Sequence, residues 1–596
     1  MKRNILLCLG LVAALTVRAE QDSALMVHIK SLDGVLEDLA TLSEAIETPI
    51  PPERIVGPFG GLMRSPSLAG VDTSKPMTIF VKLPEGDAPA MPSICMNFYV
   101  EGDGSEYLDS VKAMLPQHEN ETPSIHRFMT PAGAEGPSFT VVLKNGQVLA
   151  GDKLSNMKAM AGDLTKDRLA LFREFPGKLS LSVNTAALRD QMIKQMAQQQ
   201  EMMAKHQEAM KASGVKQDAA MTIDPGAMME SYNTMLQELL VQLSELVVNV
   251  DIGDRVSLLA HIKGQPGSIL DTLITSSAPV TGPAASLGSP NAVFSMYGSL
   301  AGMDEFIGPY AEWVSGIYAA MGPPMNKMAD PYRDLVMTMK GLFVGNYSFW
   351  MEPSEEGYPL RMAGMYGISD KVATKAAMDK MLSLMKEVTD QSMSGIAEMS
   401  SSSGGEPAMP QMNITFKQEP VGTHRGVEIE KVVFSYGVEP GPGMTPEMVE
   451  LMNNMTYYVA YGDKALYYSM GEQELMHELI DHFQSGSSGA PVRTGFEDIA
   501  QPLHGYWALD MGKMMGSFSD FMPQSGPGAG TFISNMANIE AGLRGAAYVE
   551  HGGYNMLLRA TADDLKGFKA MGAAARPQPG AMPTPPPAVP MPHGIP

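Results

Sequence analysis

Short segments in which apolar and polar residues alternate recur along the chain, and segments with helical periodicity separate them. The Asn145-Gly146 pair joins two alternating segments, and Gly462-Asp463 joins two more. Tight turns of this kind connect antiparallel strands. Apolar residues at every third or fourth position, as in 35–46, indicate amphipathic helices. Strand clusters that alternate with helices predict an α+β fold, with helices packed on one face of antiparallel sheets.

The order of these elements occurs twice. Each copy contains three units. The first and third units each consist of a strand, a helix, a hairpin and a second helix, and the middle unit consists of a hairpin and a helix. Between the copies lies 278–290, which is rich in Pro, Gly, Ser and Ala and carries no charge. This composition is typical of a linker or exposed crossing. We therefore predict an internal duplication, with two similar α+β halves over 20–277 and 291–571.

Within this scheme the hairpin and helix at 138–164 correspond to those at 456–483, although the second copy carries extra strands ahead of its hairpin. Three segments read as irregular. A Gly- and Pro-rich loop is expected at 57–70, a disordered Ser/Gly/Met-rich loop at 391–410, and a disordered Pro/Met-rich tail at 572–596.

The first 19 residues have the pattern of a secretory signal peptide. Lys2 and Arg3 precede an apolar run over 5–16, and Val17-Arg18-Ala19 fits the small-x-small cleavage pattern. Cys8 lies within the apolar run without a lipobox, which argues against a lipid anchor. No later segment is apolar over a bilayer-spanning length, so no transmembrane helix is expected. The sequence predicts a protein exported to the periplasm or the extracellular space.

Net charge limits the classes of binding partner, and cysteine content limits the disulfides that can form. Signal cleavage would remove three basic and no acidic residues, which takes the formal net charge from −23 to −26. An acidic surface argues against nucleic acid and anionic membranes as partners. After cleavage only Cys95 remains, so no intramolecular disulfide can form. Cys95 lies in the strand-like run 93–100, where a buried, small apolar residue is expected rather than a reactive thiol.

The chain contains 51 methionines, an unusual number. Methionine is flexible and fills irregular space, so this composition is typical of a loosely shaped core or of an adaptable apolar groove.

Signatures of several enzyme classes are absent from the sequence. It has no phosphate-binding loop, no His-Glu-x-x-His zinc motif, no EF-hand loop and no Gly-x-Ser-x-Gly elbow. A cysteine nucleophile would have only Cys95 to use. We therefore predict no catalytic residues, no cofactor and no enzymatic activity.

Two clusters have metal-ligand chemistry. Met203, His206 and Met210 lie on one face of a helix, and thioether with imidazole suits Cu(I). The other interpretation is the apolar stripe of a Gln-rich helix, and we favour it because no second cluster completes a site.

The second cluster is His477, Asp481 and His482. His477 and Asp481 are four residues apart and share a helix face, whereas His482 points elsewhere. A solvated helix face is the favoured interpretation, so no metal site is predicted.

Aromatic residues are dense in two pairs of strands. In an alternating strand, consecutive aromatics face opposite sides of the sheet, so one of each pair faces away from the core. The outward row could line a groove for an apolar ligand or a partner, or it could pack under a second helix layer. The residues concerned are Phe343, Tyr347, Phe349, Trp350, Tyr457, Tyr458, Tyr461, Tyr467 and Tyr468.

Two segments resemble a known group of proteins. These are Gly70-Val71-Asp72-Thr73-Ser74-Lys75-Pro76, ahead of a strand, and Tyr458-Val459-Ala460-Tyr461-Gly462-Asp463-Lys464. The sequence is similar here to uncharacterised large exported proteins of planctomycete- and verrucomicrobia-like bacteria, which are also Met/Gly/Pro-rich and disordered at the end. The resemblance implies an exported bacterial protein and no particular activity.

These observations favour a non-catalytic exported protein that binds an apolar ligand or a protein partner with its sheets. One alternative is a hydrolase whose active site is built from dispersed residues. Another is a structural protein of cell-envelope assemblies.

Overall fold

A computed structural model describes most of the chain. The described residues are 25–49, 51–82, 92–129, 139–152, 154–157, 172–185, 240–289, 291–320, 325–354, 358–402, 415–438, 446–486, 491–518 and 541–574, with isolated positions from 189 to 238 and at 539. The predicted signal peptide, the predicted tail from 575 onward, and the Met203, His206 and Met210 cluster lie outside these residues and stay predictions; residues 572–574 end a helix.

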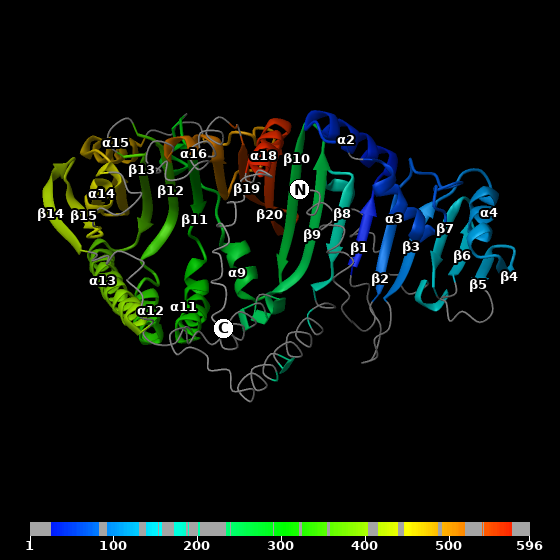
Figure 1. Cartoon of the computed structure of the whole chain (residues 1–596), viewed down its shortest axis with the longest axis horizontal. Coiled ribbons are helices and arrows are strands. Elements are labelled where there is room, and N and C mark those ends of the chain that lie inside the picture. Colours follow the sequence, from blue (N-terminus) through cyan, green and yellow to red (C-terminus); the bar gives the residue numbers. More distant parts are fainter. Residues whose placement is uncertain are drawn as a thin grey trace, which may run out of the picture.

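One antiparallel sheet of 20 strands organises the described residues (Figure 1). The strands of the first half are β1 (Leu25–Ile29), β2 (Met77–Lys82), β3 (Ser93–Tyr99), β4 (Gln117–Thr122), β5 (Ile125–Met129), β6 (Phe139–Lys144), β7 (Gln147–Gly151), β8 (Leu179–Val183), β9 (Leu243–Ile252) and β10 (Arg255–Gly264). Those of the second half are β11 (Phe294–Ser299), β12 (Phe343–Pro353), β13 (Leu360–Ile368), β14 (Thr415–His424), β15 (Val427–Ser435), β16 (Met455–Tyr461), β17 (Ala465–Met470), β18 (Gly505–Asp510), β19 (Gly542–Glu550) and β20 (Gly553–Thr561).

The two halves have the same strand order. Pairing in the first half runs β4-β5-β6-β7-β3-β2-β1-β8-β9-β10. Pairing in the second half runs β14-β15-β16-β17-β13-β12-β11-β18-β19-β20. Each strand of one half therefore has a counterpart in the other, and the α+β class with two similar halves is confirmed. The domain boundaries at 277 and 291 stay a prediction.

The halves join edge to edge through β10 and β20, which are counterparts. Leu259 is the fifth residue of β10 and Leu557 the fifth of β20, and they lie directly opposite each other. This register places a pseudo-two-fold axis through the Leu259–Leu557 pair. Rotation about this axis would superpose α2 on α11. In Figure 1, α2 lies at the upper ends of the first-half strands and α11 at the lower ends of the second-half strands.

The helices lie on both faces of the sheet. They are α2 (Leu32–Ala45), α3 (Glu53–Met63), α4 (Ser105–Met114), α9 (Ile269–Ser276), α10 (Pro283–Ser286), α11 (Met303–Ala320), α12 (Ala329–Thr338), α13 (Lys371–Ser402), α14 (Pro446–Asn453), α15 (Gln473–Gln484), α16 (Met511–Phe518) and α18 (Ala562–Ala574). Residues directly opposite in an antiparallel pair share a face. We call face A the side with Leu258 and Phe349, and face B the side with Leu259 and Trp350.

Helices α2, α3 and α4 cover face A of the first half, where Phe59 and Met63 of α3 join one core with Met77 and Phe98. Helix α15 covers face B of the second half, where its Leu479 joins the core around Trp350. The expectation that helices pack on one face only is wrong for the second half, where Met378 of α13 also packs against face A.

The segment 278–290 does connect the halves, but it is not an exposed crossing. It contains α10, and Val280, Ala284 and Ala285 are at most 5% exposed within the central core. Backbone bonds fix it to the loop that precedes β18, from Val280 N to Leu503 O and from Val492 N to Ala285 O. Its small, uncharged residues suit close packing against other backbone as well as they suit a linker.

Other local expectations also need correction. Helix α13 continues to Ser402, so a loop does not occupy the first part of 391–410. Met, Ala and Glu favour helix there, and the sequence has no glycine between 396 and 403. Helix α3 occupies part of the expected loop 57–70 because its apolar residues reach the core. Strands β4 and β5, which the sequence analysis did not predict, are the counterparts of the strands regarded as extra in the second half.

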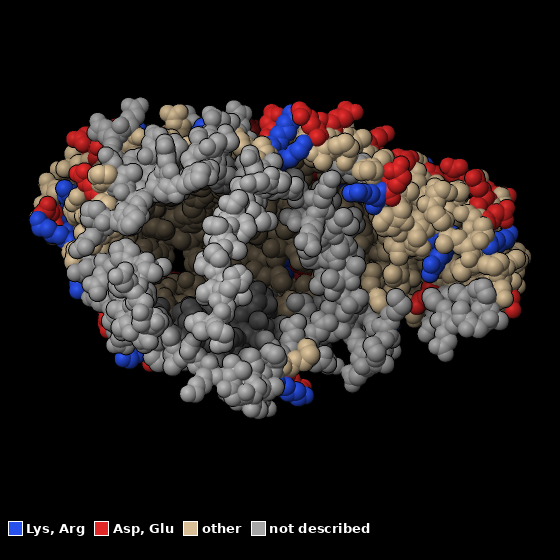
Figure 2. All heavy atoms as spheres, in the orientation of Figure 1, with Lys and Arg blue, Asp and Glu red and all other residues tan. Residues whose placement is uncertain are grey.

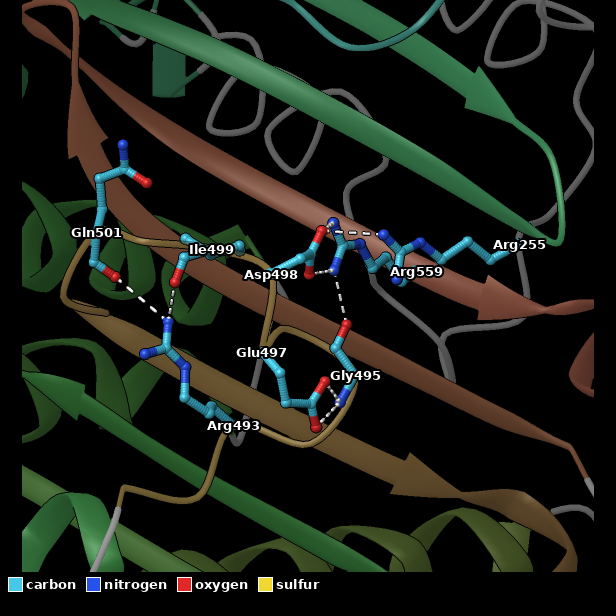
Figure 3. Close-up of polar contacts among 8 residues, drawn as sticks. All are labelled: Arg255, Arg493, Gly495, Glu497, Asp498, Ile499, Gln501 and Arg559. Atoms are coloured by element: carbon cyan, nitrogen blue, oxygen red, sulfur yellow. Dashed lines mark hydrogen bonds and ion pairs between the residues drawn. The ribbon is translucent and has the colours of Figure 1, made fainter.

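A polar cluster locks the loop 493–501 onto face B at the junction of the halves (Figure 3). Arg559 of β20 donates two hydrogen bonds to Asp498, at 2.6 and 2.8 Å, and one to Gly495 O at 2.7 Å. Arg255 of β10 donates to the same carboxylate at 2.9 Å. The Arg559 guanidinium also lies 4.9 Å from the centre of the Phe496 ring. Asp498 thus binds one arginine from each half.

The packing of 278–290 predicts resistance to proteolysis. We expect that a protease under native conditions does not cut within this segment, since cleavage needs local unfolding of buried backbone. N-terminal sequencing of the earliest fragments checks this, with urea-denatured protein as the control in which the segment is cut. Early native fragments that begin within 278–290 would contradict the packing.

Candidate functional site

Face A carries no charged side chain over a long stretch of the sheet. The opposed face-A residues of β9, β10, β20, β19, β18, β11, β12 and β13 are all aliphatic, Met, aromatic or Gly. We call the face-A surface of these eight fully described strands the apolar floor. Its bulkiest members are Leu258, Ile262, Phe294, Met296, Tyr347, Phe349, Met351, Met362, Tyr366, Trp507, Leu509, Tyr554, Met556 and Leu558.

Polar side chains of the same strands lie on face B, and several of them are buried there. Examples are Asn249 at 1% exposed, His261 at 0% and Ser348 at 0%. By contrast, Leu258 and Met556 on the floor are 38% and 46% exposed. Soluble proteins ordinarily bury the apolar face of a sheet and expose the polar one. The reversed arrangement indicates that the floor is a surface for contact with something apolar.

The duplication provides an internal comparison for this surface. In β1, β2 and β3 the face-A residues Ile29, Met77 and Phe98 are at most 1% exposed beneath α2 and α3. The counterpart strands β11, β12 and β13 carry Met296, Phe349 and other large side chains on face A that remain half-buried. The two halves share one architecture. Helices cover face A of these strands in the first half, whereas the described residues leave it partly exposed in the second half.

Aromatic rings form a connected row on the second-half floor. Phe349 lies 5.9 Å from Phe294 and 6.0 Å from Tyr468 of β17, measured between ring centres. Tyr366 continues the row, 5.7 Å from Tyr468 and 6.1 Å from Tyr347. Stacked rings hold one another in place and give a rigid apolar surface with little conformational entropy to lose.

Glycines on neighbouring strands let these rings lie flat against the sheet. A β-carbon at Gly545 would lie 2.1 Å from Trp507 Nε1, and one at Gly364 would lie 2.4 Å from the Tyr468 hydroxyl. A side chain at either position would push the ring off the strand, so the close approach requires glycine.

The floor's polar atoms come from tyrosine and tryptophan. Burial raises the pKa of the Tyr347 and Tyr554 hydroxyls on the floor, and of the Tyr468 hydroxyl on the adjacent β17, above their ordinary value. These hydroxyls therefore stay neutral at physiological pH and can donate a hydrogen bond without adding charge to the surface.

Figure 2 shows a hollow at the strands of the second half. Few of the atoms visible inside this hollow belong to Lys, Arg, Asp or Glu, whereas acidic residues cluster along the upper rim of the first half. This view agrees with the charge-free composition of the floor.

The aromatic residues predicted as candidates divide between the faces as alternation requires. Trp350, Tyr458 and Tyr467 belong to the buried core on face B. Phe343 and Tyr461 lie on face A, where Met378 of α13 packs beside them. The remaining face-A aromatics are half-buried, so the expected helix layer covers only the end of the row. Sequence analysis missed the continuation of this surface into β10, β18 and β20.

The helix cluster predicted as a weak metal candidate is bound within the protein. His424, from the end of β14, donates a hydrogen bond from Nε2 to the Asp481 carboxylate at 2.6 Å and stacks on His477 at 4.4 Å between ring centres. Arg425 also pairs with Asp481, and His424 is the main cause of the lowered pKa of that carboxyl. His482 turns away and bonds Pro283 O. In the described part of the chain no group of three metal-binding side chains is arranged to hold an ion.

Cys95 is free and buried, as expected for a small apolar residue of β3, and burial raises the pKa of its thiol to about 12. A hollow of about 460 Å³ lies between α13 and strands β14 and β15, and Lys375 and Glu430 form an ion pair on its wall.

Two serine hydroxyls contact histidine side chains, in the pairs Ser277–His504 and Ser286–His482. Among the described residues neither imidazole also contacts a carboxylate, which a catalytic triad requires.

No helix in the described residues is long and apolar enough to cross a membrane. Comparison with protein-family models, curated proteins and solved structures gives no match for this chain.

Proposed function

We propose that this protein is exported and non-catalytic, and that it holds an apolar ligand against the apolar floor. The observation that carries the proposal is the reversed burial of the sheet, with polar side chains enclosed on face B and an uncharged apolar surface open on face A. The leader-like N-terminus and the acidic composition support export and a ligand other than nucleic acid.

The chemistry of the floor favours a small apolar ligand over a protein partner. Protein interfaces carry about one hydrogen bond per 100–200 Å² and a polar rim. Backbone donors and acceptors in the middle of an antiparallel sheet are already paired, and the floor adds only tyrosine hydroxyls and one indole N–H. A ligand that is mostly hydrocarbon requires no more than this.

The direct test is extraction of the purified native protein with organic solvent, followed by mass spectrometry. We expect a co-purifying neutral, apolar molecule, and we expect the delipidated protein to bind Nile red. A protein that yields no such molecule and binds no hydrophobic probe would contradict the proposal.

Trp507 should report ligand binding directly. It lies half-buried on the floor, whereas Trp350 is 7% exposed on face B. Binding of an apolar ligand is expected to shift tryptophan emission to shorter wavelength. Trp507→Phe should remove most of that shift and Trp350→Phe should keep it. Equal loss in both variants would place the ligand elsewhere.

A further inference from the structure

The apolar floor does not stop at the boundary between the halves. Leu258 and Met556 are the fourth residues of β10 and β20, and the pseudo-two-fold axis relates them. They lie on either side of the axis and are 38% and 46% exposed. The junction, which could have separated two sites, is instead the most open apolar part of the floor.

Described elements pack against the floor near each of its ends. At one end, Met378 of α13 packs with Tyr366, Ile368 and Leu466. At the other end α2 lies against β9, and Leu179 of the adjacent β8 packs against the covered core of the first half. Seven strand spacings separate β9 from β13. At about 4.8 Å each, the track is about 34 Å long.

We infer that the ligand is a long, neutral hydrocarbon chain that lies across the strands and spans both halves. This inference rests on the proposed function and adds its ligand class. Length follows from the uninterrupted apolar track across eight strands. Neutrality follows because no Lys or Arg side chain lies on the floor strands' face A to pair with an anionic head group, and a carboxylate buried without a partner is strongly disfavoured.

The test measures affinity as a function of chain length. Saturated fatty alcohols from octanol to eicosanol, delivered from cyclodextrin, compete with Nile red on the delipidated full-length protein. Affinity is expected to rise about two- to fourfold per methylene throughout the series, as each added group is buried. Palmitic acid is expected to bind more weakly than hexadecanol.

Leu258→Glu and Met556→Glu place a charge one and two strand spacings from the β9 end of the track. Each should stop the rise in affinity at intermediate lengths and leave octanol within about twofold of the parent protein. Both positions are exposed, so the fold should persist, which circular dichroism checks. Val372→Glu, at a 78% exposed apolar residue of α13, is the matched control and should leave the series unchanged.

The outcomes separate the two claims. If no alcohol competes and Nile red does not bind, the proposed function fails. If alcohols bind but affinity stops rising at short chains, or if Met556→Glu weakens octanol and eicosanol equally, apolar binding stands and the continuous track is wrong. Palmitic acid that binds more tightly than hexadecanol would overturn neutrality.

Discussion

Asp498→Ala is expected to lower the free energy of unfolding by about 2 kcal/mol, a large effect for one side chain. The cost arises because Arg559 would lose its ion-pair partner. The Arg559 side chain is 10% exposed, and among the described residues its carboxylate partner is Asp498, so the variant leaves its charge unpaired. Asp498 itself is 48% exposed, which makes the cost smaller than for a fully buried pair. Chemical denaturation monitored by circular dichroism measures the change.

Asp109→Ala is the matched control. Asp109 forms a surface pair with Lys112, and both side chains are at least 40% exposed, so its loss should change stability by about 0.5 kcal/mol or less. Equal midpoints for the two variants would show that the cluster of Figure 3 contributes nothing special to the junction of the halves.

The same pair predicts a dependence on pH. Hydrogen bonds from Arg559 are the main cause of the lowered pKa of Asp498. A carboxyl with a depressed folded-state pKa stabilises the fold above its unfolded-state pKa, and the contribution disappears as pH falls through the folded value. The gap between parent and Asp498→Ala should therefore be full at neutral pH and shrink below the ordinary value of 3.8. A gap that widens on acidification would contradict this assignment.

Local patterns predicted most strands and the repeated order of elements. The turn at Asn145-Gly146, for instance, joins β6 and β7 as expected. Strand β4 was missed because its sequence, QHENET, has no apolar residue and all of it is exposed at the sheet edge. Its partner β5 supplies the register, which is a tertiary property that a polar run does not encode.

The candidate site could be predicted in part. Aromatic alternation in 343–350 correctly indicates an outward row. In β10, however, Val256, Leu258 and Ile262 alternate with Ser257 and His261, which predicts a buried apolar face and an exposed polar one. The structure has the opposite, because the loop 493–501 and the core around it cover face B. Which face of a strand is covered depends on segments far away in the sequence. The periodicity of one strand therefore cannot predict which of its faces is buried.

Phe349→Glu is expected to weaken binding of a long-chain alcohol about 100-fold or more. The phenyl ring lies at the centre of the aromatic row, in contact with Phe294 and Tyr468. Its loss removes about 2 kcal/mol of apolar contact, and an unpaired carboxylate beneath a hydrocarbon adds a desolvation cost of similar or greater size. Nile red displacement measures the affinity, and thermal unfolding checks that the fold is retained.

Met114→Glu is the control for this variant, because Met114 is 42% exposed on α4 in the half whose face A is already closed. It introduces the same charge and should leave the affinity within about twofold of the parent protein. Phe349→Leu, which keeps the surface apolar, should retain most of the binding. If Phe349→Glu and Met114→Glu bind equally well, the ligand does not lie on the second-half floor, and the difference in coverage between the halves has another cause.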